Sequence, residues 1–474
     1  MNFIKKHLFA ILFIGIVLYI VIGTLAPFAV YSNISDEKIR ELTEQPFLKN
    51  EIGTERAMIL ETAESAWEER IRLMDQAKTR IVLTTFDLRE GKSSEDLLSV
   101  LLHKASEGVN VQILVDGMSG FLQLEGHPLF YALSTHPNVE MRLYNPICFV
   151  TPWKLQGRMH DKYVLIDDRA YIMGGRNSFD YFIGNYEAYS KSLDREVLVY
   201  NTDPKQQGSI GALYSYFESI WNMPETKPFH NDESLADHPK VAERREFLES
   251  HYNELKKNHP DLFSEFDYET VTCPIEAAEL VTNPQHIYEK EPVVFFVMTE
   301  LMKRAEKSVV VHTPYIVCND YMYDRLTEAA SSVPNAKFVI NSVENGDNLV
   351  ASSDYLRNKK NVIKTGFDLY EYDGGTSSHG KSMVIDDEIA VIGSYNFDLR
   401  STYMDTEMML VIKSQDLARE LNNNMDHFEK DCRYVIDEER YEVPEHVHVR
   451  EISKTKECLM HVIGFLLKPF RYVI

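Results

Sequence analysis

A polar motif that occurs twice constrains the fold of this chain more than any other feature. Residues 157–177 read GRMHDKYVLIDDRAYIMGGRN, and residues 378–396 read SHGKSMVIDDEIAVIGSYN. Both follow the pattern His-x-Lys, four residues, Asp, six residues, Gly-Gly/Ser-x-Asn. Structural repeats usually keep their apolar positions and lose their polar ones, whereas here both kinds are kept. The pattern therefore predicts one site that is built from two copies.

Each copy also predicts the local structure that presents its polar residues. Residues 163–166 and 170–173 form short apolar runs typical of buried strands, and residues 382–385 and 389–392 repeat them. A His and a Lys two positions apart on a strand point to the same face. The Gly pair allows a close turn, after which the Asn returns an amide toward that face. Each copy is thus expected to offer an imidazole, an ammonium group and an amide together.

Two such copies around one cavity suit a phosphodiester. Two Lys and two Asn side chains would neutralise and orient the non-bridging oxygens, while one His attacks phosphorus and the other protonates the leaving oxygen. A covalent phosphohistidine would follow, resolved by water or an alcohol, and the chemistry needs no metal. The predicted catalytic residues are His160, Lys162, Asp167, His379, Lys381 and Asp386, with Asn177, Asn396 and Ser394 as phosphate-binding residues.

The duplicated motif resembles the signature of the phospholipase D superfamily, and residues 393–407, GSYNFDLRSTYMDTE, look most like bacterial cardiolipin synthases. The resemblance spans about residues 54–432 and implies His160 as the nucleophile and His379 as the general acid. It also implies a carboxylate, some thirty residues downstream, that hydrogen-bonds the other nitrogen of each His. Asp-x-Glu occurs at both places, so Glu196 and Glu407 are favoured, with Asp194 and Asp405 as the alternatives. The resemblance implies no cofactor.

Beyond the motifs, whole domains are duplicated. Residues 56–78 predict a helix followed by a strand at 81–86, and residues 293–307 and 309–315 repeat that order. The expected fold is α/β, with two similar α/β/α sandwich repeats whose mixed sheets are related by a pseudo-twofold axis, preceded by an N-terminal transmembrane helix. The predicted divisions are an anchor (1–35), a first repeat (36–222), a charged linker or insert (223–275), a second repeat (276–432) and a C-terminal tail (433–474).

The N-terminal segment predicts a membrane anchor. Residues 8–35 carry no charge and are long enough to span a bilayer, which takes about 20 apolar residues. A cleaved signal peptide is the alternative, but Pro27 after Ala26 spoils the best cleavage site. Lys5 and Lys6 precede the segment, so the positive-inside rule places the N-terminus in the cytoplasm and the catalytic part outside the cell membrane.

Two further apolar segments have two interpretations each. The tail from Lys454 to Ile474 mixes basic and apolar residues, and it either lies in the headgroup region of a membrane or packs on its own domain. Phe149 and Trp153 form either an apolar lip for acyl chains or ordinary loop packing. His312 and Asp87 end the matching first strands and are candidates for the rim of the site.

Composition narrows the function. A net charge of −23 weighs against nucleic acid, whose binding normally rests on a basic surface. The leading hypothesis is a membrane-tethered phosphatidyltransferase or phospholipase acting on phospholipid, with phosphatidylglycerol as the first substrate to test. A phospholipid hydrolase that releases phosphatidic acid and a phosphodiester nuclease of the same superfamily are the alternatives. A non-catalytic membrane scaffold is disfavoured because both motifs are complete.

Overall fold

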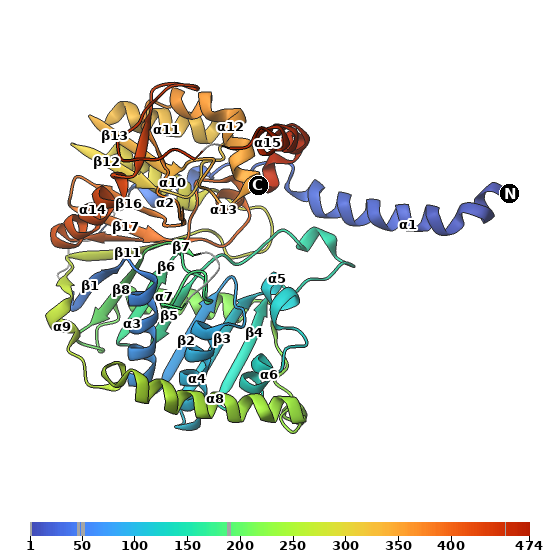
Figure 1. The fold of residues 1–474 in the computed structure, drawn as a ribbon, viewed down its shortest axis with the longest axis vertical. Helices are drawn as coiled ribbons and strands as arrows, with labels where there is room; N and C mark the ends of the chain where they lie inside the picture. The colour runs from blue at the N-terminus through green and yellow to red at the C-terminus, as the bar shows by residue number, and fades with distance from the viewer. Residues whose placement is uncertain (1, 45–47, 49–52, 187–190, 451) are drawn as a thin grey trace.

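Two lobes of mixed α/β structure lie one above the other, and a long helix projects from their side (Figure 1). The computed structural model describes residues 2–44, 48, 53–186, 191–450 and 452–474. Each lobe is built on one nine-stranded sheet. In spatial order the first sheet contains β10 (Cys273–Pro274), β1 (Glu55–Leu60), β8 (Glu196–Asn201), β6 (Ala170–Gly174), β5 (Tyr163–Ile166), β2 (Arg80–Thr85), β3 (Asn110–Asp116), β4 (Val139–Tyr144) and β9 (Thr226–Pro228).

The second sheet repeats this order. Its strands are β11 (Ala277–Thr282), β18 (Met408–Lys413), β17 (Ile389–Gly393), β16 (Ser382–Ile385), β12 (Ser308–His312), β13 (Asn335–Asn341), β14 (Asp368–Tyr372), β19 (Cys432–Val435) and β20 (Tyr441–Glu442). Starting from β1 and β11, the two sheets match strand for strand up to β9 and β19. In both, the strands β2–β3–β4 and β12–β13–β14 are parallel and the motif strands beside them are antiparallel. The predicted α/β duplication is confirmed.

Helices cover the outer face of each sheet. Those of the first lobe are α3 (Ala63–Gln76), α4 (Lys92–Ser106), α6 (Pro128–Ser134) and α8 (Pro239–Asn258), with the short α5 (Gly117–Ser119) and α9 (Tyr268–Val271) at its edges. Those of the second lobe are α10 (Val293–Lys303), α11 (Asp320–Ser332) and α12 (Leu349–Lys364), with the short α13 (Leu399–Tyr403) after its motif. Their apolar faces and the outer faces of the sheets form two separate cores.

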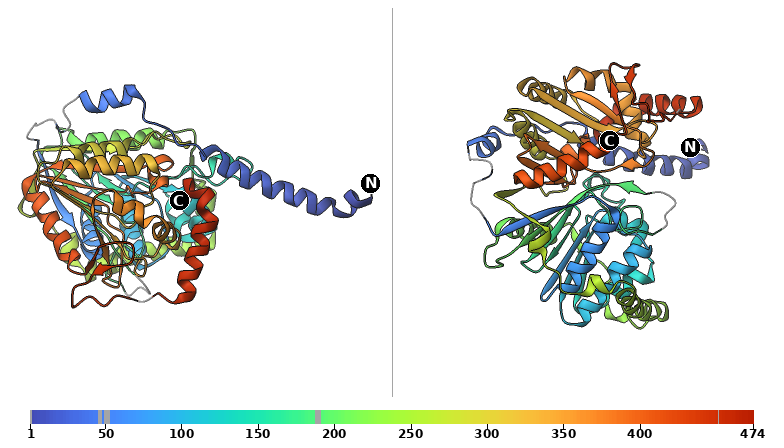
Figure 2. Two further views of the ribbon diagram at one scale, coloured as in Figure 1. Left: turned by 90° about the horizontal axis from the view of Figure 1, so that it is seen from above. Right: turned by 60° about the vertical axis from the view of Figure 1, so that its left-hand side comes forward.

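A third core joins the lobes. It contains the inner faces of both sheets together with α7 (Gly208–Trp221) and α14 (Gln415–Glu429). The helix α7 contacts β11 of the second lobe, and α14 contacts β1 of the first. Each lobe therefore helps to bury the other's inner sheet face. Figure 2 (right) shows the two lobes stacked on each other.

One expectation about local structure needs correction. Residues 55–60 form β1 rather than the start of a helix, because Thr62 caps α3 with its side chain and a helix begins only after it. The charged segment 223–275 packs on the first lobe, where β9 pairs with β4, β10 pairs with β1, and α8 lies on α4 and α6.

The two ends of the chain flank the second lobe. The helix α1 (Asn2–Leu25) is apolar, and residues 7–28 have the length and composition needed to cross a membrane, with a mean hydropathy of 2.8. It is followed by α2 (Asp36–Glu44), and Phe28 between them is buried in the core of the second lobe. The C-terminal segment forms α15 (Lys454–Leu467) and a short 3-10 helix, η6 (Lys468–Val473).

Candidate active site

The two motifs meet across the contact between the lobes. Short backbone pairings join the lobes just before each motif histidine: β7 (Ser192–Leu193) runs parallel to β15 (Ser377–Ser378), and Met159 pairs with Thr406. The His379 N–H donates to the Leu193 carbonyl at 2.6 Å, and the His160 N–H donates to the Thr406 carbonyl at 3.2 Å. Each histidine is thus held by the backbone of the opposite lobe.

A carboxylate from the opposite lobe hydrogen-bonds each imidazole. The Nδ1 atom of His160 lies 2.9 Å from Oε1 of Glu407, and Nδ1 of His379 lies 2.8 Å from Oδ2 of Asp194. Both carboxylates are fully buried, whereas the imidazoles retain 15% and 14% of their exposure. Because the carboxylates occupy Nδ1, Nε2 is the nitrogen available for reaction in both histidines.

The prediction that Glu196 supports a motif histidine is wrong, and Asp194 has that position. The Asp-x-Glu sequences suggest that Glu196 and Glu407 correspond, but the sheets give another register. Gly174 pairs with Glu196, and the equivalent Gly393 pairs with Met409. Glu196 therefore corresponds to Met409, and Asp194 corresponds to Glu407.

Glu196 has a structural partner instead. Its carboxylate accepts two hydrogen bonds from the Arg70 guanidinium, at 2.7 and 2.6 Å, and Arg176 lies 3.7 Å away. All three side chains are almost completely buried. The other carboxylate weighed by sequence, Asp405, forms an ion pair with Arg400 at 3.0 Å.

The two motif copies differ at one position of the shared pattern, which is Gly175 in the first copy and Ser394 in the second. Each of these residues suits the carboxylate that it faces. Ser394 donates a hydrogen bond to Glu407, which also accepts one from Ser401. At the corresponding place in the first copy, a Cβ on Gly175 would lie 2.6 Å from the Asp194 carboxylate. Asp194 thus requires a glycine at position 175, whereas Glu407 is held in place by the hydroxyl of Ser394.

Two buried lysines contribute the positive charge. Lys162 and Lys381 are almost fully buried, and each donates to the backbone carbonyl of the histidine two residues before it. Burial lowers the pKa of Lys162 to about 7 and that of Lys381 to about 8, against the opposing effects of Glu407 and Asp194. The positive charge of Lys381 also lowers the pKa of Lys162.

The two histidines differ in their electrostatic environment. Burial, Lys162 and Lys381 hold the pKa of His160 well below its usual range, and burial raises the pKa of Glu407. Burial and Lys381 also lower the pKa of His379, but Asp194 opposes them. Although burial would raise the pKa of Asp194, Lys381 and His379 outweigh it and keep this carboxylate ionised. A neutral imidazole is therefore favoured at His160, and a charged one is better supported at His379.

The two asparagines lie at the same strand ends but have different partners. The side-chain oxygen of Asn177 accepts the Asp87 N–H at 3.2 Å, whereas the amide of Asn396 donates to the Tyr315 hydroxyl at 3.3 Å. The oxygen of Asn396 is buried without a hydrogen-bond partner among the described residues. Aromatic rings line the site as well: the rings of Phe86 and Phe182 lie edge-on to His160 and His379.

The structure does not bring Asp167 and Asp386 to the imidazoles. Each follows a motif strand and adopts a positive φ, 51° and 56°, in the turn of a hairpin. The Asp167 carboxylate accepts the backbone N–H groups of residues 78–80, and that of Asp386 accepts those of residues 306–308. Their predicted catalytic role is corrected to a structural one, because these carboxylates fasten the loops that enter β2 and β12.

This assignment makes a stability prediction. Replacing Asp167 by alanine should lower the free energy of unfolding by about 1–3 kcal/mol, since three backbone N–H groups lose their acceptor. Turnover by the remaining folded protein should stay within about threefold, because a whole strand separates Asp167 from His160. Asparagine tolerates positive φ and keeps an acceptor, so Asp167→Asn should cost less. Thermal unfolding and activity measured on the same samples test this; a turnover loss without destabilisation would refute it.

Two candidates for the rim of the site have other roles. His312 is buried, and its ring nitrogens contact Glu429 at 3.0 Å and Arg195 at 3.3 Å. Asp87 pairs with Arg89 and accepts a hydrogen bond from Ser119. Sequence reasoning missed Ser401 and Arg400 altogether. Their only signal is their place in the second motif's helical turn, three and two residues after the Asp398 N-cap.

Comparisons with known proteins show which family the chain belongs to. The family described as "Cardiolipin synthase, PLD-like domain" matches residues 71–221 and 298–429, which contain both motifs. Cardiolipin synthase C of Escherichia coli (strain K12) is 25% identical over 425 residues, covering 81% of this chain and 86% of its own. Cardiolipin synthase 2 of Staphylococcus epidermidis is 24% identical over 365 residues, covering 75% and 64%.

A solved structure shares the fold. The crystal structure of phosphatidylserine synthase from Haemophilus influenzae Rd KW20 superimposes with a TM-score of 0.66 and 13% identity, covering 92% of this chain and 99% of that one. The family match extends over more than half of the chain and includes both histidines with their lysines. The chain therefore belongs to the phospholipase D superfamily of enzymes, in the family of cardiolipin synthase, PLD-like domains.

Proposed function

We propose that this protein is a membrane-anchored phosphatidyltransferase that transfers a phosphatidyl group through a phosphohistidine, as a cardiolipin synthase does, with phosphatidylglycerol as the donor. The observation that carries the proposal is the pair of imidazoles, each hydrogen-bonded at Nδ1 by a buried carboxylate of the other lobe. Two positioned imidazoles beside two buried lysines suit in-line displacement at a phosphodiester. The cardiolipin synthases among the relatives support the lipid substrate.

The first step forms a covalent intermediate. Glu407 accepts the Nδ1–H of His160, which leaves a lone pair on Nε2 to attack phosphorus. The bond between phosphorus and the glycerol oxygen breaks, and the Nε2–H of His379 protonates that oxygen. Lys162 and Lys381 neutralise the charge on the non-bridging oxygens. Free glycerol leaves, and the phosphatidyl group remains on His160.

The second step reverses these roles. His379, now neutral, takes the proton from a hydroxyl of a second phosphatidylglycerol as that oxygen attacks phosphorus. The bond between phosphorus and Nε2 of His160 breaks, which releases cardiolipin and regenerates the enzyme. Asp194 stabilises the imidazolium that forms on His379. Attack by water in place of the alcohol would give phosphatidic acid.

The anchor belongs to the same proposal. Residues 7–28 have the length and composition of a membrane span, and residues 8–19 of α1 are exposed. Lys5 and Lys6 precede it, so the N-terminus is assigned to the cytoplasm and the catalytic lobes to the outer side of the membrane. An enzyme whose substrate is a bilayer lipid gains from such tethering, because both stay in one plane.

Product analysis tests the proposal. Full-length protein incubated with labelled phosphatidylglycerol in vesicles should produce cardiolipin and glycerol in equal amounts. Phosphatidic acid as the sole lipid product would replace the transferase by a hydrolase. Cleavage of DNA without any action on lipid would overturn the proposal in favour of a nuclease.

The pKa values of His379 and the two lysines predict the alkaline limb of the pH profile. The value of kcat/KM should begin to fall below the usual histidine pKa, because burial and Lys381 lower the pKa at which His379 loses the proton that it gives to the leaving oxygen. It should fall further as the pH rises through about 7 to 8, since Lys162 and Lys381 then lose the charge that binds phosphate. The acidic limb should lie well below the usual histidine pKa, because His160 stays neutral there. In the Lys381→Arg variant, the part of the decline near pH 8 should disappear, because arginine keeps its charge at that pH. This holds whatever the absolute rate of the variant. An unchanged alkaline limb in this variant would show that another group titrates.

A further inference from the structure

The C-terminal helix α15 exposes its apolar side to solvent. Its inner side packs on α12 through Met460 and Gly464, where a Cβ on Gly464 would lie 2.9 Å from the Ser353 carbonyl. The outer side carries large apolar residues that are 48–66% exposed: Leu459, Val462, Phe465 and Leu466. Such a stripe on a docked helix means that a further apolar partner is missing.

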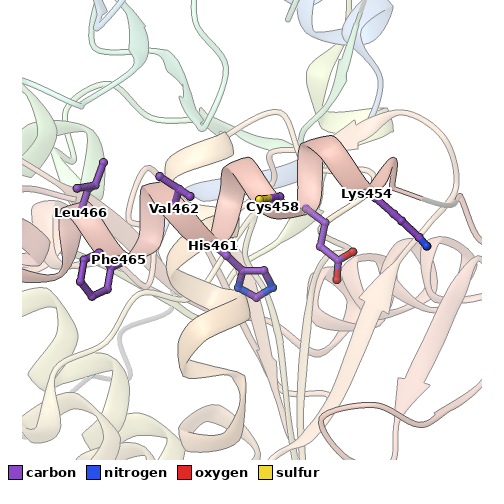
Figure 3. A pocket seen from close by; sticks show the side chains of 7 residues that line it. Lys454, Cys458, His461, Val462, Phe465 and Leu466 are labelled. Atoms are coloured by element: carbon purple, nitrogen blue, oxygen red, sulfur yellow. The ribbon is translucent and has the colours of Figure 1, made fainter.

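Figure 3 shows the outer side of α15 from close by. A shallow hollow runs along it, and its lining side chains, among them Cys458, Val462 and Phe465, all come from α15 itself. A hollow bounded by one helix alone has no opposite wall, so it is an open surface and not a pocket for a small ligand.

Two loops of the first lobe form a second exposed apolar patch. The π-helix η2 (Gly120–Leu124) carries Phe121 and Leu122, and the loop around the 3-10 helix η3 (Pro152–Lys154) carries Phe149, Val150 and Trp153, all 39–75% exposed. The rings of Phe121 and Phe149 contact each other edge to face. The two loops therefore present one apolar tip.

The anchor helix leaves the molecule beside this tip. The Tyr19 hydroxyl donates to the Val150 carbonyl at 2.8 Å, and Gly23 packs so closely on Pro152 that a Cβ would lie 2.5 Å from it. In Figures 1 and 2, α1 projects away from the body on the side where α15 lies, and α15 runs across the direction of α1. A helix that crosses the direction of a membrane span lies along the membrane surface.

Arg400 connects the two apolar patches to the site. It donates hydrogen bonds to Gln156, just after the loop tip, and to Asp405, two residues before Glu407. The N–H of Arg400 donates to the carbonyl of the C-terminal Ile474. The loop tip and the segment that follows α15 are thus both hydrogen-bonded to Arg400. Arg400 in turn binds Asp405, two residues before the Glu407 that supports His160.

We propose that the outer side of α15 and the loop tip together, here called the apolar face, lie on the surface of the bilayer that α1 crosses. Phospholipid would then reach His160 directly from the bilayer. The exposed Lys454 and Lys468 at the two ends of α15 suit anionic headgroups. This inference rests on the proposed function for its anchor, and a bilayer is favoured over a second copy because the face continues the surface from which α1 emerges.

Depth measurement in proteoliposomes tests the contact. Full-length protein with Cys148 and Cys273 replaced by serine would carry an environment-sensitive fluorophore on Cys458, which is exposed on α15. The control fluorophore is placed by Glu269→Cys, in a Cys458→Ser background, on α9 at the side away from α1 (Figure 1). Lipids with a nitroxide on the acyl chain should quench the first fluorophore several-fold more strongly than the second. Equal quenching at both positions would overturn the inference.

A matched pair of variants adds a functional readout. Phe465→Glu with Leu466→Glu should lower turnover of phosphatidylglycerol in vesicles about tenfold, and leave turnover of a water-soluble phosphodiester unchanged. Val271→Glu places the same charge on an exposed apolar residue of α9 and should change neither. Equal loss on both substrates would overturn the inference. So would cross-linking of Cys458 between two copies with no lipid quenching.

The outcomes for the two proposals are separate. If lipid turnover persists while the Cys458 fluorophore stays in water, the apolar face is refuted and the phosphatidyltransferase stands. If no phospholipid is converted while the fluorophore is quenched, the contact stands and the proposed reaction fails.

Discussion

Replacing His160 by alanine is expected to lower the turnover of phosphatidylglycerol by at least about 10⁴-fold, because the nucleophile of the first step is lost and water cannot be held in its place. The fold should survive, since Glu407 keeps the hydrogen bonds from Ser394 and Ser401. Initial rates of cardiolipin formation and thermal unfolding of the same preparation measure both effects. Replacing His427, an exposed histidine on α14, should change neither.

The activity of a His379 variant is expected to depend on the leaving group of the substrate, unlike that of the His160 variant. His379→Ala should lose a similar factor with phosphatidylglycerol, because no acid protonates the departing glycerol oxygen. With a p-nitrophenyl phosphodiester, whose leaving group departs without a proton, His379→Ala should regain a burst of product, while His160→Ala should remain inactive. A burst in the His160 variant instead would exchange the two roles.

The second large effect is a difference between substitutions of Asp194 and Glu196, two carboxylates that are only two residues apart. Asp194→Asn should lower turnover by about 10²- to 10⁴-fold, because Asp194 orients His379 and stabilises its charge. It should also lower the stability, because the buried negative charge that faces Lys381 and His379 is lost. Glu196→Gln should lower the free energy of unfolding by roughly 3–5 kcal/mol, because it leaves Arg70 buried beside Arg176 without a carboxylate. Its turnover per folded molecule should be nearly unchanged.

Thermal unfolding and specific activity of both variants, measured side by side, decide this point. The conservative change Asp194→Glu should recover little activity, since the extra methylene moves the carboxylate away from its present 2.8 Å contact with Nδ1 of His379. If Glu196→Gln lost activity without losing stability, the strand register that pairs Gly174 with Glu196 would be wrong.

The sequence predicted the fold and the centre of the site because the motif repeats polar identities together with the strands that present them. The pairing of carboxylates with histidines was not predictable in the same way. Asp194 and Asp405 both precede a glutamate by two residues, so the sequence aligns them, whereas hydrogen bonding to Gly174 and Gly393 shifts the register by two. Strand register depends on long-range pairing, which a local pattern does not encode.

Not every polar residue that the motif repeats takes part in catalysis. Asp167 and Asp386 recur with the histidines, yet they serve the hairpin turns, so recurrence alone does not separate chemistry from folding. No sequence pattern indicated that each histidine is hydrogen-bonded by a carboxylate of the opposite lobe, because the His160–Glu407 contact joins residues nearly 250 positions apart. At the C-terminus, sequence left two interpretations open for one segment. Residues 468–474 pack on the second lobe, and Arg471 binds Asp354 there, while α15 keeps an apolar outer side.

The most direct test of the central claim is to locate the covalent intermediate. Full-length protein would be mixed with labelled phosphatidylglycerol and quenched within one turnover, and its peptides would be mapped by mass spectrometry under alkaline conditions that preserve a phosphohistidine. We expect a phosphatidyl group on the peptide that contains His160. A phosphatidyl group on His379, or cardiolipin formation with neither histidine modified, would contradict it.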